Sequence, residues 1–216
     1  MKVIVSIVMA ALCVCTGAEA KSKDHHLPAN QSGKFDYYVM SLSWSPTFCE
    51  SHQTNPQCDK HPGFVLHGLW PQFQSGGYPQ HCSTRETLTE ESRALGVTVF
   101  PTEQLMVHEW QTHGTCNGTS AIDYLRTAQT AHNSIKVPPQ LEPGGNKKAM
   151  TAQQIAKLVR DANPAVTARS LAIVCGNKEL AEVRICLAKH DLKPIPCGNK
   201  VSNSCGTAPV QVPGIQ

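Results

Sequence analysis

The stretch FVLHGLW, residues 64–70, places a single histidine in an otherwise apolar run of β-favouring residues. Pro62-Gly63 precedes the run and Pro71 follows it, and both interrupt regular structure. The pattern predicts a strand that carries His67 near its end. Because apolar side chains dominate this strand, His67 is a candidate for chemistry.

Other β-favouring stretches lie on both sides of this strand along the chain. Residues 35–44, FDYYVMSLSW, predict a strand bounded by glycine and proline. Residues 171–175 and 183–187 flank the turn signal Gly176-Asn177, and together they predict a β-hairpin.

Start and stop signals predict helices between these strands. Glu103 opens a predicted helix that runs through His113 to Gly114. Capping boxes that begin at Ser120 and Thr151 predict two more helices. Strands and helices occur in runs without βαβ alternation, so the sequence predicts an α+β fold with an antiparallel-type central sheet and packed helices.

Residues 1–20 form a separate segment. An apolar run over residues 3–15 is followed by small residues up to Ala20, which is the pattern of a secretory signal cleaved after that alanine. A lipid anchor on Cys13 or Cys15 is the competing interpretation, but a bulky residue precedes each of these thiols. The run is shorter than the roughly 20 residues that span a membrane, so we expect no membrane association after cleavage.

The mature chain, residues 21–216, has the length and composition of one globular domain. We expect it to be exported, to the periplasm or the medium, or to an endomembrane compartment in a eukaryote. The net charge of the chain is +3, below that of proteins that hold duplexes by charge alone. Its ten histidines gain charge below about pH 6.5, so we expect a pH optimum below neutrality. No exposed apolar helix argues for assembly, and we expect a monomer.

The cysteines of the mature chain are even in number, as a disulfide framework requires. No C-x-x-C pair occurs among them, which removes the most specific zinc signature. We therefore expect about four disulfides, no metal site and no cofactor, although spacing alone leaves the connectivity open. The cysteines are Cys49, Cys58, Cys82, Cys116, Cys175, Cys186, Cys197 and Cys205.

A second stretch, HEWQTHGTC at residues 108–116, concentrates polar side chains on a predicted helix. Its histidines are five apart, which separates them by about 140° on a helix, so it is not a zinc-binding H-E-x-x-H motif. Glu109 and His113 are four apart and are predicted to be adjacent, so that the carboxylate orients the imidazole. Trp110 is predicted to point into the core.

Two imidazoles, His67 and one from the second stretch, would supply the two halves of an acid–base pair. Neither stretch offers an activated serine or a free cysteine, so the nucleophile has to come from the substrate or from water. RNA carries its own nucleophile, the 2′-hydroxyl, beside the scissile bond. One imidazole would accept the 2′-hydroxyl proton and the other would protonate the leaving 5′-oxygen, without a metal.

These two stretches, FVLHGLWP and HEWQTHGTC, resemble the two signature segments of the ribonuclease T2 family. They occur in the family's order about forty residues apart, and the likeness spans most of the mature chain. The resemblance implies the family's α+β fold. It also implies metal-independent endonucleolytic cleavage of single-stranded RNA through 2′,3′-cyclic phosphates to 3′-phosphates, with little base preference. DNA lacks the 2′-hydroxyl, so no DNA cleavage is expected.

The resemblance also implies roles for the residues of the two stretches. His113 corresponds to the general base and His67 to the general acid. Glu109 corresponds to a partner in transition-state stabilisation, and His108 to a binding group on the phosphate side.

Substrate contacts follow from the same resemblance. Trp70 and Tyr78 match aromatic residues that stack a base. Two positions depart from the family pattern: Thr112 stands where many members have lysine, and Gln72 where some have an acidic residue or asparagine. A hydroxyl offers a neutral hydrogen bond in place of a full charge, so the rate could be lower or another cation could substitute.

The resemblance suggests two disulfides near the C-terminus, Cys175 with Cys205 and Cys186 with Cys197. Cys49 with Cys58 would complete the set. A bridge between Cys82 and Cys116 would brace both motif segments.

Two other functions compete with a ribonuclease. A catalytically weak T2-like protein that binds RNA or a partner is motivated by Thr112, and a histidine-rich metal-dependent hydrolase is motivated by the histidine content. RNA cleavage by the mature protein, measured in excess chelator, separates all three hypotheses. The other histidines are interpreted as ordinary surface or core residues: His25, His26, His52, His61, His81, His132 and His190.

Overall fold

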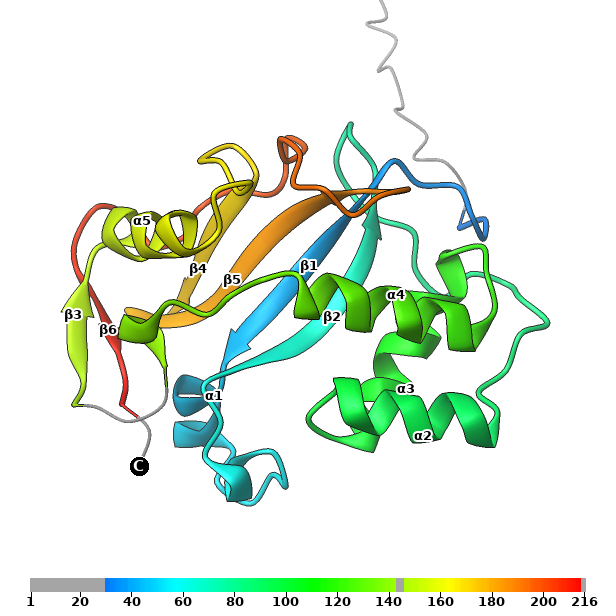
Figure 1. The fold of residues 1–216 in the computed structure, drawn as a ribbon, viewed down its shortest axis with the longest axis horizontal. Coiled ribbons are helices and arrows are strands. Elements are labelled where there is room, and N and C mark those ends of the chain that lie inside the picture. The colour runs from blue at the N-terminus through cyan, green and yellow to red at the C-terminus, as the bar shows by residue number, and fades with distance from the viewer. Residues whose placement is uncertain (1–29, 143–145, 215–216) are drawn as a thin grey trace, which may run out of the picture.

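The computed structural model describes residues 30–142 and 146–214 (Figure 1). The predicted signal segment, residues 1–20, lies outside the described residues. Within the described part of the chain, every helix is too short or too polar to traverse a lipid bilayer.

A six-stranded sheet forms the centre of the described structure. Its path runs β2-β1-β5-β6-β3, and β4 pairs with β5. The pairings are antiparallel apart from one parallel contact between Glu179 of β5 and Gln211 of β6. The α+β fold with an antiparallel-type sheet is therefore confirmed. The strands are β1 Tyr37–Trp44, β2 Phe64–Gln72, β3 Lys148–Met150, β4 Leu171–Gly176, β5 Glu179–Ala188 and β6 Val210–Val212.

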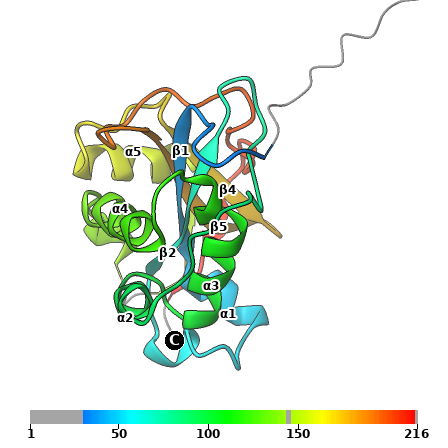
Figure 2. The same cartoon turned by 90° about the vertical axis from the view of Figure 1, so that its right-hand side faces the viewer.

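The helices cover one face and one edge of this sheet. In Figure 2 the sheet is seen nearly edge-on, with α4 and α5 together on one side of it. Helix α3 contacts the edge strand β2, and α2 packs against α3 and α4. The helices are α1 Ser45–Ser51, α2 Glu90–Val99, α3 Glu103–Thr112, α4 Ala121–Asn133 and α5 Ala152–Ala162.

Side chains of β1 alternate between two environments, as a strand requires. Tyr38, Met40 and Leu42 are buried in the main core beneath the helices. Tyr37 and Val39 face the other side, where a smaller cluster forms around Cys186. The second face of the sheet is therefore available to carry polar side chains.

Strand β2 carries a β-bulge at His67. Ser41 of β1 is opposite Gly68, and the next residue, Leu42, is opposite Leu66, so His67 has no partner on β1. A bulge inserts one residue, bends the strand and changes the direction of the inserted side chain. The bulge therefore sets the orientation of His67.

The predicted helix starts are present, but one predicted end is wrong. Ser120 caps α4, and Thr151 forms a full capping box at α5. Helix α3 ends at Thr112 and not at Gly114: the N–H of His113 still donates to the carbonyl of Glu109, but φ at His113 is −116° and a 3₁₀ turn begins at Gly114. A Cβ at Gly114 would lie 2.5 Å from the Trp110 ring, so the close packing of this turn requires glycine.

Four disulfides link the described cysteines, in the pairs that the sequence analysis names. Cys82–Cys116 joins the loop after β2 to the end of the second motif, and Cys186–Cys197 joins β5 to the C-terminal loop. The other two are Cys49–Cys58 and Cys175–Cys205.

The core beneath α4 predicts the stability effect of one substitution. Leu125 of α4 is fully buried, so we expect Leu125→Ala to lower the free energy of unfolding by about 2–5 kcal/mol. Urea unfolding with the disulfides intact measures this. Val97 of α2 is 50% exposed, and Val97→Ala is the matched control, with an expected change within about 0.5 kcal/mol. Equal destabilisation by both variants would contradict the assignment of the core.

Candidate active site

The two motif segments meet at the Trp70 indole. Its ring lies 5.1 Å from the His67 ring and 5.5 Å from the His113 ring, measured between centroids. The Tyr78 ring lies 5.7 Å from the His113 ring. Strand β2 supplies His67 and Trp70, whereas His113 directly follows α3. The structure therefore brings both predicted imidazoles to one aromatic platform, which consists of the Trp70 and Tyr78 rings.

Glu109 lies on the His67 side of this platform. Its carboxylate is buried, Oε2 accepts a hydrogen bond of 2.7 Å from Nε1 of Trp70, and Oε1 is 3.8 Å from Nε2 of His67. The pairing of Glu109 with His113 that the sequence predicted is wrong. The backbone N–H of His113 still donates to the carbonyl of Glu109, but the Glu109 carboxylate contacts Trp70 and His67 in place of the His113 ring.

Position 68 requires glycine because the side chains of Glu109 and Trp70 occupy the space that a Cβ would need. A Cβ at this position would lie 2.1 Å from Oε2 of Glu109 and 2.2 Å from Nε1 of Trp70, which no side chain can occupy. The glycine of the first motif thus makes room for the hydrogen bond that joins the two motifs.

Glu182 of β5 is a site residue that sequence reasoning missed. It is 8% exposed, and its Oε1 lies 2.7 Å from Nδ1 of His67. Its Oε2 accepts a hydrogen bond of 2.7 Å from Nε of Arg184, and Nη2 of Arg184 lies 2.6 Å from the same oxygen as an ion pair. The available signal was a pair of charged residues two apart within the apolar run of this strand, which places both on one face.

The surroundings of His67 and His113 shift their pKa values in opposite directions. Burial alone lowers the pKa of His67, but the hydrogen bond and charge of Glu182, together with Glu109, raise it above 6.5. Burial lowers the pKa of His113 to about 4, aided by the positive charges of His108 and His67. At pH 6.5, therefore, more of His67 than of an ordinary histidine carries a proton, whereas His113 carries almost none.

The two carboxylates also differ in protonation. Burial raises the pKa of Glu109 to about 7, against the influence of His67 and Trp70. Burial also acts to raise the pKa of Glu182, but its hydrogen bond to His67 and the charge of Arg184 lower that pKa to about 2. Glu182 is therefore a carboxylate throughout the working range, whereas Glu109 exchanges a proton near neutrality.

Each imidazole has one nitrogen that is free to act. Nδ1 of His67 is held by Glu182, which leaves Nε2. Nδ1 of His113 is buried without a hydrogen-bond partner in the described residues, which again leaves Nε2. The arrangement can therefore donate a proton from one Nε2 and accept a proton at the other.

The remaining predicted contacts divide into exposed and buried side chains. His108 is exposed, and Tyr78 is 48% exposed beside the His113 ring. Gln72 is 7% exposed and lines a cavity next to Tyr78. Thr112 is also 7% exposed, and its hydroxyl is buried without a partner among the described residues. The structure does not expose the hydroxyl on which a substrate contact of Thr112 would depend.

Two cavities flank the platform. One of about 540 Å³ is lined by Gln72, Tyr78, Arg184 and Lys200 among others, and no carboxylate lines it. The other, of about 300 Å³, adjoins His67. The platform therefore has one cavity on the Tyr78 side and one on the His67 side.

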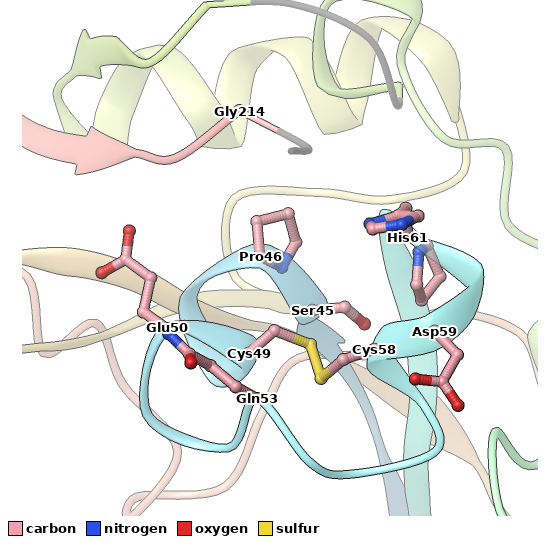
Figure 3. A pocket seen from close by; sticks show the side chains of 10 residues that line it. Ser45, Pro46, Cys49, Glu50, Gln53, Cys58, Asp59, His61 and Gly214 are labelled. Carbon is pink, nitrogen blue, oxygen red and sulfur yellow. A yellow bond between two sulfur atoms is a disulfide. The ribbon is translucent and has the colours of Figure 1, made fainter.

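Another cavity lies away from the motif residues. It has a volume of about 650 Å³ and adjoins the Cys49–Cys58 disulfide, with Pro46 and His61 on its walls (Figure 3). None of the predicted catalytic or substrate-binding residues lines it.

Across residues 30–142 and 146–214, no group of three or more His, Cys, Asp or Glu side chains could hold a metal ion.

Beyond Glu182 and Arg184, two basic residues near the platform were not assigned from the sequence. His81, interpreted there as an ordinary residue, acts on the pKa of His113, and its backbone N–H donates to the carbonyl of Thr112. Lys200 lines the cavity beside Tyr78. Both lie in loops without a motif, and no pattern in the sequence distinguishes them.

Comparisons with known proteins agree on one family. A sequence model of the ribonuclease T2 family matches residues 35–197. A ribonuclease of Aeromonas hydrophila is 36% identical over 185 residues, which cover 82% of this chain and 84% of that protein.

Solved structures show the same fold. An RNase-related protein from Calystegia sepium matches with a TM-score of 0.65 and 21% identity, over 83% of this chain and 96% of that chain. A ribonuclease MC1 variant in complex with 5′-UMP matches with a TM-score of 0.63 and 21% identity, over 83% of this chain and 98% of that chain.

The opposite pKa shifts of His67 and His113 predict that the two rings titrate at different pH. In an NMR titration of the histidine ring signals, His113 is expected to become protonated near pH 4, because burial and neighbouring positive charges disfavour its proton. His67 is expected to lose its proton only above pH 6.5. Coincident titration of both rings near the ordinary pKa of about 6.5 would contradict the described surroundings.

Proposed function

The chain belongs to the ribonuclease T2 family of RNA-cleaving enzymes, and from that premise we propose the path of its reaction. The enzyme cleaves single-stranded RNA internally, without a metal or cofactor, through 2′,3′-cyclic phosphates to 3′-phosphates. One observation carries this proposal: two imidazoles with oppositely shifted pKa values contact a single indole ring.

His113 acts as the general base of the first step. Its pKa of about 4 leaves it neutral at working pH, and Nε2 is its available nitrogen. It accepts the proton of the 2′-hydroxyl while this oxygen attacks the adjacent phosphorus.

His67 acts as the general acid. Glu182 and Glu109 favour the charged ring and raise the pKa of His67 above its ordinary value, so its acid form persists to higher pH than in an ordinary histidine. Nε2 donates this proton to the departing 5′-oxygen, and the 2′,3′-cyclic phosphate remains. In the second step the roles reverse: His67 takes a proton from water, which attacks phosphorus, and His113 protonates the 2′-oxygen to give the 3′-phosphate.

The charge that develops on the phosphoryl oxygens requires donors. The protonated form of Glu109, available below its pKa of about 7, donates a hydrogen bond to one of these oxygens. His108 is exposed near His113 and binds on the phosphate side. Arg184, whose guanidinium lies 5.1 Å from the centre of the Trp70 ring, supplies a cation beside the indole that both imidazoles contact.

The two cavities fit the two nucleosides of the scissile linkage. The nucleoside that provides the 2′-hydroxyl lies on the His113 side, where Tyr78 stacks its base and Gln72 offers an amide. The leaving nucleoside lies on the His67 side, in the cavity of about 300 Å³. Stacking on Tyr78 accepts every base, which supports low base preference.

Export is also part of the proposal. Four disulfides require an oxidising compartment, and residues 1–20 have the composition of a secretory signal. The mature chain from residue 21 onward is one catalytic domain that acts as a monomer, without a membrane contact and without cleaving DNA.

A catalytically weak T2-like RNA-binding or partner-binding protein is the second candidate. The observation that favours it is Thr112, which replaces the family's lysine with a buried, neutral side chain. RNA bound by the purified mature protein but left intact would support this second candidate.

Removing either imidazole is expected to abolish turnover. His67→Ala and His113→Ala should each lower kcat/KM on single-stranded RNA at least 10²-fold, because each removes one proton transfer. Cleavage is measured with excess chelator present, and 2′-deoxy RNA is the uncleavable substrate. His190→Ala, at an exposed histidine outside the site, is the control with unchanged activity. Near-wild-type activity of either motif variant, or complete loss of wild-type activity in chelator, would overturn the proposal.

The pH profile follows from the same assignments. Activity requires neutral His113, so the rate falls as pH drops toward the pKa of about 4. Activity also requires protonated His67 and is assisted by protonated Glu109, so the rate falls again as pH rises through the raised pKa of His67 and the pKa of about 7 of Glu109. A bell-shaped profile of kcat/KM with its maximum between these limits is expected. A rate that still rises above pH 8 would contradict the assignment of His67 as the acid.

A further inference from the structure

We propose that Glu182 is a positioning residue, which holds the His67 ring by its Nδ1 and thereby aims Nε2 at the leaving oxygen of the substrate. The inference rests on the proposed function, since it concerns the ring assigned as general acid. The structure carries it through a partly buried hydrogen bond of 2.7 Å between Glu182 of β5 and His67 of β2.

The sheet brings these two side chains together across the intervening strand. Glu182 is paired with Ser43 of β1, and Ser43 is paired with Val65 of β2. Ser41 and Ser43 are small, so long side chains from the outer strands can meet above β1. The bulge at His67 gives its side chain the direction that this contact requires.

The hydrogen bonds of Glu182 allow one orientation of the His67 ring. Arg184 occupies Oε2 through the Nε hydrogen bond and the Nη2 ion pair, which leaves Oε1 for Nδ1 of His67. Because Glu182 is ionised, it accepts this bond and Nδ1 keeps its hydrogen. Nε2 is then the nitrogen that loses and regains a proton in both steps.

Glu109 cannot take over this role. Its Oε1 is 3.8 Å from Nε2 of His67, beyond hydrogen-bond distance, and its Oε2 is occupied by Trp70. It also faces the nitrogen that has to reach the substrate. Glu182 acts from the opposite side of the ring, where it does not compete with substrate.

The charged groups around His67 determine the sign of a change at Glu182. Strand β5 contributes the carboxylate of Glu182 and the cation of Arg184, whereas Glu109 faces the ring from α3 and His113 from the turn after it. From β1 the paired neighbours are serines, which are neutral. Neutralising Glu182 leaves Arg184 unopposed, so the proton of His67 is held less tightly.

The Glu182→Gln variant tests the inference, because glutamine keeps the shape and removes the charge. The His67 ring signal is expected to titrate at lower pH, and the alkaline limb of the kcat profile is expected to move to lower pH with it. The acid limb, which belongs to His113, is expected to stay in place. We expect kcat at neutral pH to fall about 10- to 100-fold, with little change in KM. Glu179→Gln is the matched control on the same strand, since Glu179 pairs with Lys147 outside the site.

The leaving group separates positioning from a general loss of structure. A uridine 3′-phosphodiester with a 4-nitrophenolate leaving group needs little protonation of that group, so the defect of Glu182→Gln is expected to shrink to about 2-fold on this substrate.

Glu182→Asp keeps the charge but withdraws it by one methylene, and is expected to give an intermediate rate and an intermediate alkaline limb. This second variant keeps the test available if Glu182→Gln does not fold.

The results distinguish the inference from the function on which it rests. If His67→Ala is inactive while the Glu182 variants keep the wild-type rate, alkaline limb and His67 titration, Glu182 has no positioning role. If the defect is equal on both substrates with an unmoved alkaline limb, Glu182 is merely structural and the inference is wrong. If His67→Ala itself remains active, the proposed function fails.

Discussion

The indole N–H of Trp70 donates to the buried carboxylate of Glu109 directly above Gly68, and the geometry of the site depends on this contact. Trp70 belongs to the first motif and Glu109 to the second, so the bond fixes α3 against the edge strand β2. A buried carboxylate without a donor would be costly, which makes the arrangement specific. With the two elements fixed, both imidazoles contact the same indole ring. The Cys82–Cys116 disulfide restrains the end of the second motif.

The two imidazoles are chemically alike but have different neighbours, and this difference supports an acid and a base at one pH. His67 is held by an ionised carboxylate, whereas His113 is partly buried among other histidines with Nδ1 unpaired in the described structure. Pairs of titratable groups whose pKa values are driven apart are typical of acid–base sites. The roles that family resemblance implies for these residues thus agree with those that their surroundings favour.

The sequence predicted the features that depend on local pattern and missed those that depend on pairing across the sheet. Strand periodicity and capping residues indicated β1, β2, α4 and α5, and the motifs indicated the central histidines. The predicted Glu109–His113 pair failed because the Glu109 carboxylate contacts Trp70 and His67, which lie on the strand β2 and not on the same helix. Glu182 is more than one hundred residues from His67 in sequence, and only the strand order and the bulge bring them together. The burial of Thr112 likewise depends on packing that no local pattern encodes.

The most direct test of the central claim is a crystal structure of the enzyme with a bound 2′-deoxy dinucleotide, which cannot be cleaved. The phosphodiester is expected between His67 and His113, with Nε2 of His67 within about 3.2 Å of the 5′-oxygen and Nε2 of His113 facing the 2′-position. A phosphate that contacts only one of these rings, or that binds in the cavity beside Cys49–Cys58, would contradict the account.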